Sequence, residues 1–355
     1  MNGADILADL RARKTPAVAR AISLVENGRP GFEELLSELH PFLGHARRIG
    51  ITGPPGAGKS TLTEQLVVAY RKAGLTVAVV AVDPTSPFTG GALLGDRIRM
   101  ESVALDPGVF IRSMATRGSL GGLATTTREV CDVLDAGGYD RILIETVGVG
   151  QSELDVARSA DSTVLVLVPE SGDGIQTLKS GVMEIGDIFV VNKADRPGAD
   201  RLRQEIEVTL GIRAGNAFRH VRAHHGTAAG RAGKAGKRDV ETTPDVPAVS
   251  ALPAWQHPVL ATVAVDGKGI AELVAALEAH HAELERAGGL AARRRQRLFD
   301  RTREVVDRGT RLWLWQETGA EQLIRDRLGE LEAGRASPYE VAAEVLEALK
   351  QGSRV

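Results

Sequence analysis

The chain has 355 residues, of which 43% are hydrophobic and 25% charged, and its 44 basic and 46 acidic side chains leave a formal net charge of -2. This length and composition fit one large globular domain with extensions, or two domains, and the charge balance disfavours a protein that works mainly on nucleic acid. The single cysteine, Cys131, excludes an internal disulfide framework and disfavours a cysteine-based metal site.

The beginning of the chain, MNGADILADLRARK, carries acidic residues and lacks the apolar stretch of a secretory signal. The sequence also lacks a run of about 18 apolar residues, the length that a membrane-spanning helix needs. We therefore expect a cytoplasmic protein with no membrane partner and no nucleic-acid partner.

Residues 1–46 are predicted to form an N-terminal helical extension. The segments ADILADLRARK, PAVARAISLVEN and GFEELLSELHPFL place apolar residues three and four positions apart, which is the spacing of one helix face. From Arg48 onward the pattern changes, so the extension is expected to end just before that residue.

The middle of the chain alternates short β-rich segments with helical ones. The predicted strands are RIGITG, TVAVVAVD, GVFIRSM, RILIETVG, STVLVLVPE and DIFVVNKAD. Several are almost continuously apolar, as strands buried on both faces of a parallel sheet are. Helical segments such as STLTEQLVVAYRKAG and LATTTREVCDVLDAGG would supply the crossovers. The pattern predicts an α/β fold with a doubly wound, mostly parallel sheet.

The first predicted strand leads into GPPGAGKST, which fits the phosphate-loop pattern G-x-x-x-x-G-K-[ST]. Its glycines let the backbone turn tightly and direct N–H groups at phosphate oxygens, and the helix that follows adds its positive end. Lys59 is expected to reach the β- and γ-phosphates, and the Ser60 hydroxyl to bind Mg²⁺. The predicted nucleotide-binding residues of this loop are Gly53, Pro54, Pro55, Gly56, Ala57, Gly58, Lys59, Ser60 and Thr61.

The segment FVVNKAD indicates which base is bound. Asn192, Lys193 and Asp195 form N-K-x-D at the end of an apolar strand. A carboxylate at Asp195 can accept hydrogen bonds from N1–H and the exocyclic amine of guanine, whereas adenine has no N1–H. A buried polar group left without a partner costs about 1–3 kcal/mol, so the pattern favours guanine. Lys193 can lie along the base, and Asn192 can join the loops.

The hydrolytic residues are predicted at the ends of two further strands. In RILIETVGVGQSE, Gly148 can donate its N–H to the γ-phosphate, and Glu145 can bind Mg²⁺ through water or order the region. Asp83 ends the second strand and Asp96 follows in a Gly-rich loop, so both are candidate metal ligands or water-positioning groups. A strand-end cap for Asp83 and an ordinary turn for Asp96 are the alternatives. Val149 stands where a water-positioning Gln is common, so hydrolysis without a partner is expected to be slow.

The segment PESGDGIQTLKSG follows another strand and carries Asp173, Gln176 and Lys179. These residues would lie at the same edge as the nucleotide. Taken alone, the segment is more typical of a turn and a solvated helix start.

The last third of the chain contains a predicted loop, a final strand and a helical arm. Residues of about 211–253 are rich in Gly, Ala, Thr and Pro and lack periodicity, which predicts a long loop. The strand PVLATVAV and the helix GIAELVAALEAHHAELERAGG then close a domain of residues 47–287. Residues 288–355 are helical and charged, with apolar positions seven apart at Leu298, Val305 and Leu312. They either pack on the preceding domain or pair with a second copy of the chain.

Together these segments resemble the MeaB/ArgK family of P-loop GTPases, which includes the methylmalonic aciduria type A proteins. The family serves as G-protein chaperones of adenosylcobalamin-dependent acyl-CoA mutases. The matching segments are GPPGAGKST (53–61), VDPTSPFTGGALLGDRIRM (82–100), FIRSMATRGSLGGLA (110–124), ETVGVGQSE (145–153), PESGDGIQTLKSG (169–181) and NKADRPGAD (192–200).

The resemblance implies a P-loop GTPase domain over residues 47–287 that binds GTP or GDP with Mg²⁺ and hydrolyses GTP slowly. A B12-dependent mutase, such as methylmalonyl-CoA mutase or a relative, would accelerate hydrolysis, and the nucleotide state would gate cofactor loading and protect or reactivate the mutase. The C-terminal helices would form a homodimerisation arm.

The resemblance also assigns residues to parts of the GTPase. Asp83 and Asp96 fall on the first switch and Glu145 on the second. Asp173, Gln176 and Lys179 match a third switch that couples partner binding to hydrolysis. The expected catalytic residues are Lys59, Asp83, Asp96 and Glu145, and the expected metal ligands are Ser60, Asp83, Asp96 and Glu145.

The 211–253 loop departs from compact members of the family, which connect these parts more briefly. It carries the histidines His220, His224 and His225 and the basic residues Arg219, Arg222, Arg231, Lys234, Lys237 and Arg238. Solvated side chains, a contact with a partner and a metal site are three interpretations of these residues.

Three other functions share parts of the pattern. A GTPase metallochaperone that inserts nickel would have the same loop and N-K-x-D, but it should also show a Cys/His cluster. A small-molecule kinase would need an acceptor site and has no use for N-K-x-D. A nucleotide-bound scaffold would not hydrolyse GTP even with a partner.

Overall fold

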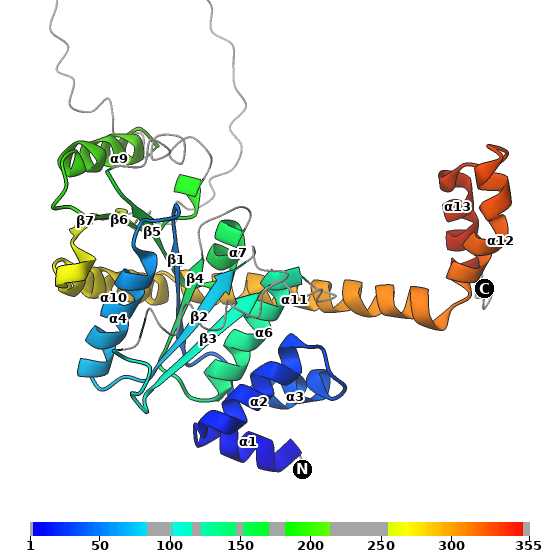
Figure 1. The fold of residues 1–355 in the computed structure, drawn as a ribbon, viewed down its shortest axis with the longest axis horizontal. Helices are drawn as coiled ribbons and strands as arrows, with labels where there is room; N and C mark the ends of the chain where they lie inside the picture. The colour runs from blue at the N-terminus through cyan, green and yellow to red at the C-terminus, as the bar shows by residue number, and fades with distance from the viewer. Residues whose placement is uncertain are drawn as a thin grey trace, which may run out of the picture.

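The computed structural model describes residues 3–83, 100, 102–115, 122–146, 152–169, 182–213 and 255–350. These residues form a single α/β body from which a long helix projects (Figure 1). The predicted 211–253 loop lies outside the described residues from residue 214 onward.

A parallel sheet of seven strands forms the centre of the body, in the order β3-β2-β4-β1-β5-β6-β7. All pairs of neighbouring strands are parallel. The chain adds β2, β3 and β4 on one side of β1 and β5, β6 and β7 on the other, which confirms the predicted doubly wound sheet. The strands are β1 (Arg47–Thr52), β2 (Val77–Asp83), β3 (Val109–Ala115), β4 (Arg141–Thr146), β5 (Ser162–Leu167), β6 (Ile188–Asn192) and β7 (Val259–Thr262).

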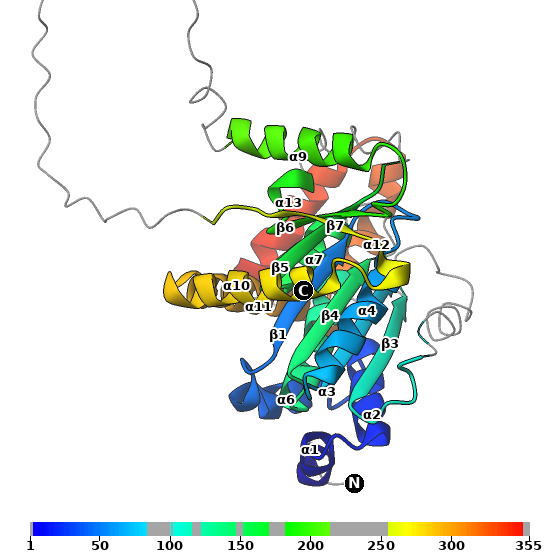
Figure 2. The same ribbon diagram turned by 90° about the vertical axis from the view of Figure 1, so that its left-hand side faces the viewer.

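Helices cover both faces of the sheet. As a consequence, β4, β5 and β6 are buried along their whole length. α4 (Lys59–Lys72) and α10 (Ile270–Arg286) pack on the face that receives Val79, whereas α6 (Gly122–Ala136) packs on the face that receives Val80. Figure 2 shows the strands between these layers. The remaining elements are α1 (Gly3–Arg11), α2 (Thr15–Glu26), α3 (Phe32–Leu39), η1 (His40–Phe42), α7 (Ser152–Ser159), η2 (Val182–Glu184), α9 (Ala199–Arg213), η3 (Ala264–Asp266), α11 (Gly289–Leu312), η4 (Trp313–Glu317), α12 (Ala320–Glu332) and α13 (Pro338–Lys350).

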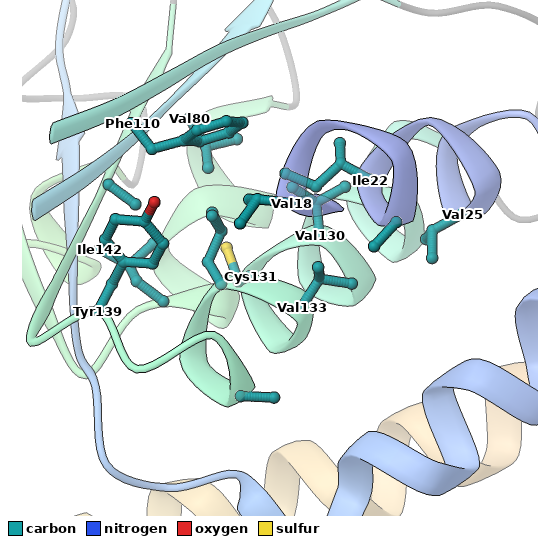
Figure 3. Close-up of a cluster of buried hydrophobic side chains, with 14 of the residues drawn as sticks. Val18, Ile22, Val25, Val80, Phe110, Val130, Cys131, Val133, Tyr139 and Ile142 are labelled. Atoms are coloured by element: carbon teal, nitrogen blue, oxygen red, sulfur yellow. The ribbon is translucent and has the colours of Figure 1, made fainter. Parts of the chain in front are cut away.

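The N-terminal helices share a hydrophobic core with the sheet. Val18 and Ile22 of α2 face Val130 of α6, and Phe110 of β3 lies in the same cluster (Figure 3). The Asp135 carboxylate at the end of α6 accepts hydrogen bonds from the backbone N–H groups of residues 44–46 at 2.9–3.0 Å. The described N-terminal residues form the helices α1, α2, α3 and η1 between Gly3 and Phe42, and these helices complete one layer of the α/β body.

The structure differs from the predicted elements in three places. The last strand ends at Thr262 rather than Val265, because the chain turns into η3 and pairs Val263 with Lys268. α9 continues past Gly211 to Arg213, supported by ion pairs such as Arg203–Glu207. α7 and α9 themselves were not predicted.

The helical C-terminal region lies partly on the body and partly beyond it. α11 runs beside α6 and α7 and then leaves the body, and α12 and α13 pack together at its far end (Figure 1). Within the described residues, no helix combines the length and the apolar character needed to cross a bilayer.

The contact of α7 with β1 yields a test of the fold. An added Cβ at Gly50 would lie 2.8 Å from Val156 Cγ1 and 3.1 Å from the Ala160 Cβ. Gly50→Ala is therefore expected to lower the free energy of unfolding by about 1–3 kcal/mol, measured by urea denaturation.

Gly211→Ala is the matched control. Among the described residues nothing lies within 4 Å of a Cβ added at Gly211, and the position is helical. Its expected effect is a gain of at most about 1 kcal/mol. A Gly50→Ala protein as stable as the wild type would show that α7 does not press on β1.

Candidate nucleotide-binding site

The predicted phosphate loop joins β1 to the first turn of α4 at the carboxyl edge of the sheet. Gly53 has φ of 140°, and a Cβ there would collide with the carbonyl oxygen of Val166 in β5. Gly58 has φ of 83°, and its Cβ would lie 2.5 Å from Asn192 Nδ2. Both positions therefore require glycine, because the loop is pressed against β5 and β6.

Lys59 is buried at the start of α4. Its Nζ donates hydrogen bonds to the carbonyl oxygens of Gly53 at 2.8 Å and Pro54 at 2.9 Å. Burial lowers the pKa of the Lys59 ammonium, and the carboxylates of Glu145 and Glu153 oppose that shift. The loop thus holds a cation within a ring of its own backbone, and a phosphate group is the natural ligand of such a cation.

Ser60 and Glu145 meet beside the loop. The Ser60 hydroxyl donates a 2.5 Å hydrogen bond to Glu145 Oε1, and the neighbouring strand ends are linked by Thr52 and Thr146, whose hydroxyl oxygens are 3.2 Å apart. A hydroxyl and a carboxylate that converge in this way are the hard oxygen ligands that Mg²⁺ prefers. The residues present therefore fit a bound Mg²⁺.

Asn192 connects the phosphate loop to two other loops. Its amide nitrogen donates to the carbonyl oxygen of Ala57 at 2.8 Å, and its amide oxygen accepts from Thr262 Oγ1 at 3.0 Å and the N–H of Ala264 at 3.1 Å. Lys193 follows in the left-handed region, with φ of 56°. This unusual backbone turns the chain sharply at the end of β6.

The turn after β7 belongs to the site, although no sequence motif marks it. Thr262 and Ala264 bond Asn192, and the Ala194 N–H donates to the carbonyl oxygen of Thr262 at 3.0 Å. The available signal was a Gly-containing turn, TVAVDGKG, directly after the last strand. It resembled an ordinary strand end.

The structure places only some of the other predicted residues. Asp83 is the last residue of β2, whose backbone reaches the same edge of the sheet, since Val82 pairs with Thr146. The described residues do not include Asp96, Gly148, Asp173, Gln176 or Lys179. Asp195 is exposed in the turn that follows β6.

α7 adds a charged residue near the phosphate loop. Glu153 lies in its first turn, and Glu153 and Lys59 each shift the pKa of the other. Burial raises the pKa of Glu153, and the Lys59 ammonium works in the opposite direction. Lys59 therefore has two carboxylates near it, Glu145 from β4 and Glu153 from α7.

Comparisons with known proteins show which family this chain resembles. A family model described as "Methylmalonyl Co-A mutase-associated GTPase MeaB" matches residues 18–314. A Pyrococcus abyssi protein whose name describes a GTPase is 48% identical over 290 residues, covering 82% of this chain and 79% of its own length. The Escherichia coli GTPase ArgK is 42% identical over 196 residues, 54% of this chain and 59% of its own length.

Two further similarities are to a mouse protein and to a solved crystal structure. The mouse protein "Methylmalonic aciduria type A homolog, mitochondrial" is 48% identical over 148 residues, covering 42% of this chain and 36% of its own length. The crystal structure of a LAO/AO transport system kinase superposes with a TM-score of 0.65 at 27% identity, covering 99% of each chain.

Removing the Asn192 amide tests the connection between the loops. Asn192→Ala leaves the buried Ala57 carbonyl and the Ala264 N–H without this partner, so stability should fall by about 1–3 kcal/mol in urea denaturation. Affinity for GDP, measured by calorimetry, should fall as well, because the loops lose their link. Asn27→Ala, which removes an exposed bond to Ser23, is the control that should change neither quantity. Unaltered GDP affinity in Asn192→Ala would contradict the expectation.

Proposed function

The chain belongs to the MeaB family of methylmalonyl-CoA mutase-associated GTPases, and from this premise we propose that it is a G-protein chaperone of an adenosylcobalamin-dependent acyl-CoA mutase. Methylmalonyl-CoA mutase or a relative would be the partner. GTP hydrolysis would be slow in the free protein and faster on the mutase, and the nucleotide state would gate cofactor loading and repair.

One observation supports the GTP-binding part of the proposal beyond the family match. Asn192 of the N-K-x-D segment is hydrogen-bonded to the phosphate loop at Ala57, so the two motifs belong to one site. A nucleotide held there would meet a phosphate-binding cation at Lys59 and a guanine-selective carboxylate at Asp195. An adenine nucleotide would leave that carboxylate without one of its donors.

The proposed roles of the residues follow from their chemistry. Lys59 would exchange its bonds to loop carbonyls for bonds to the β- and γ-phosphates. Ser60 and Glu145, with Asp83 and Asp96, would hold Mg²⁺, which when bound neutralises charge on the phosphate oxygens. Gly148 would donate its N–H to the γ-phosphate.

Two further proposals concern partners. Asp173, Gln176 and Lys179 would form the segment that couples docking of the mutase to hydrolysis. The C-terminal region would be a homodimerisation arm, which accords with the exposure of large apolar side chains along it. These side chains are Leu298, Phe299, Val305, Val306, Trp313, Trp315, Leu328 and Leu346.

The chaperone proposal is tested by nucleotide hydrolysis with Mg²⁺, alone and with purified cobalamin-dependent mutases. We expect slow turnover of GTP, little turnover of ATP, and a rate increase of at least about tenfold with one mutase, because partners can complete a water-positioning set. Turnover that no mutase changes would exclude the chaperone proposal. Stoichiometric nickel binding in that case would favour a metallochaperone, and an absence of hydrolysis would favour a scaffold.

Base selection is tested with Asp195→Asn. The amide offers a donor in place of one acceptor, so it should pair poorly with guanine and better with xanthine, whose C2 carries an oxygen. We expect GTP affinity to fall by up to about 100-fold and xanthosine triphosphate to become the better substrate, since a lost charged partner costs up to about 3 kcal/mol. Asp200→Asn, an exposed change in the first turn of α9, is the control. Retained GTP preference in Asp195→Asn would exclude this role.

A further inference from the structure

Arg297 of α11 joins the C-terminal helix to the end of α7. Arg297 Nη1 donates to the carbonyl oxygen of Ser159 at 2.8 Å, and Arg297 Nη2 forms an ion pair with Asp161. The Ser159 carbonyl belongs to the last turn of α7, where backbone carbonyls lack partners within the helix and attract cations. One guanidinium therefore contacts both the end of α7 and Asp161, which lies two residues beyond that helix.

Asp161 is the centre of this connection. Its side chain is 1% exposed, accepts from the backbone N–H of Arg48 at 3.1 Å, and also pairs with Arg294 at 3.0 Å. Burial alone would raise the pKa of this carboxyl, but the guanidiniums of Arg297 and Arg294 outweigh burial and hold the pKa well below its usual range. The carboxylate thus stays ionised, and removing an arginine would leave buried charge poorly compensated.

α7 has little freedom to move against the strand that leads to the phosphate loop. Val156 and Ala160 approach Gly50 of β1 so closely that a Cβ at Gly50 would lie 2.8 Å and 3.1 Å from them. Gly50 lies three residues before Gly53, where the phosphate loop begins. A shift of α7 along β1 would therefore displace the backbone of β1 directly beside the phosphate loop.

The other end of α7 carries the nucleotide-site residue. Glu153, in the first turn, interacts electrostatically with Lys59. α7 begins at Ser152, four residues after Gly148, the last residue of the E-T-V-G segment in the sequence. A helix of 8 residues is about 12 Å long, so displacement of its Ser159 end is transmitted to the Glu153 end.

We propose that Arg297 is a positioning residue for GTP hydrolysis, which holds α7 in register with β1 so that Glu153 in the first turn of α7 keeps its place beside Lys59 of the phosphate loop. Because Arg297 belongs to α11, the helix that continues into the C-terminal arm, the arm can influence hydrolysis through this contact. The inference rests on the GTPase activity of the family and is independent of the mutase partner.

The surroundings of Arg297 indicate that it carries the connection largely through polar contacts. A cavity of about 360 Å³ lies beside it, between α7, η2 and α11, and Leu154, Ala157 and Gln296 are among its lining residues. Apolar packing is therefore incomplete where α7 faces α11. Leu298, the next residue of α11, is exposed, so it supplies little burial there.

The experiment compares Arg297→Gln and Arg297→Lys with Arg295→Gln in the full-length protein, without a mutase. Arg295 is exposed on α11 and makes no hydrogen bond or ion pair with the described residues. Steady-state GTP hydrolysis gives kcat and KM, and amide hydrogen exchange of the GDP-bound proteins reports on α7, with α4 as the internal reference.

We expect Arg297→Gln to lower kcat at least about fivefold while KM changes less than about twofold, because positioning acts on the reaction rather than on binding. Amides of α7 should exchange about tenfold faster, with α4 unchanged, since the helix end loses its anchor. Arg297→Lys keeps the charge but cannot form the same pair of bonds, so it should show a smaller loss, and Arg295→Gln should match the wild type.

Both readouts must change for the proposal to stand. A kcat within twofold of the wild type, or unaltered α7 exchange, would overturn it. Equal acceleration of exchange in α4 and α7 would indicate a general stability role and would also overturn it. If Arg297→Gln does not fold, Arg297→Lys decides the question, and wild-type kcat and exchange in that variant would overturn the proposal. A missing response to every mutase would leave these results unaffected, so the two proposals fail separately.

Discussion

The organisation of the nucleotide edge depends on the side-chain amide of Asn192. Parallel strands bring their carboxyl ends to one edge of the sheet, but hydrogen bonds between the loops are needed to hold those loops together. Asn192 donates to the phosphate loop and accepts from the turn after β7, so three loops share one buried amide. Gly58 must be glycine for the same reason, since a Cβ would lie 2.5 Å from that amide.

Near the Asn192 side chain, the site concentrates charged groups in a small, largely buried space. Lys59 loses hydration on burial, which lowers its pKa, and it is compensated by loop carbonyls and by the nearby carboxylates of Glu145 and Glu153. A bound phosphate group can replace the loop carbonyls as the partner of the Lys59 ammonium and bring a full negative charge to it. The pre-existing arrangement therefore favours an anionic ligand without a large rearrangement of the loop.

The opposite end of the body uses charge differently. α11 is joined to α6 and α7 mainly by arginines that pair with carboxylates that are almost fully buried, including Asp161, Asp132 and Glu129. Such pairs contribute modestly to net stability because desolvation offsets attraction, yet breaking one is costly. They tie α11 to the body at Asp161, Asp132 and Glu129 before the helix continues toward α12 and α13.

The sequence by itself determined the local features. Continuous apolar runs such as Leu143 and Ile144 predicted buried parallel strands, and the spacing of Gly53, Lys59 and Ser60 predicted the phosphate loop, because both signals depend on neighbouring residues. Tertiary structure alone decided that the N-terminal helices complete the α6 layer, that α7 presses on Gly50, and that Thr262 and Ala264 join the site. It also brought Arg297 to Asp161, 136 residues away. Such contacts arise only when distant segments pack together, so no local pattern of spacing or composition records them.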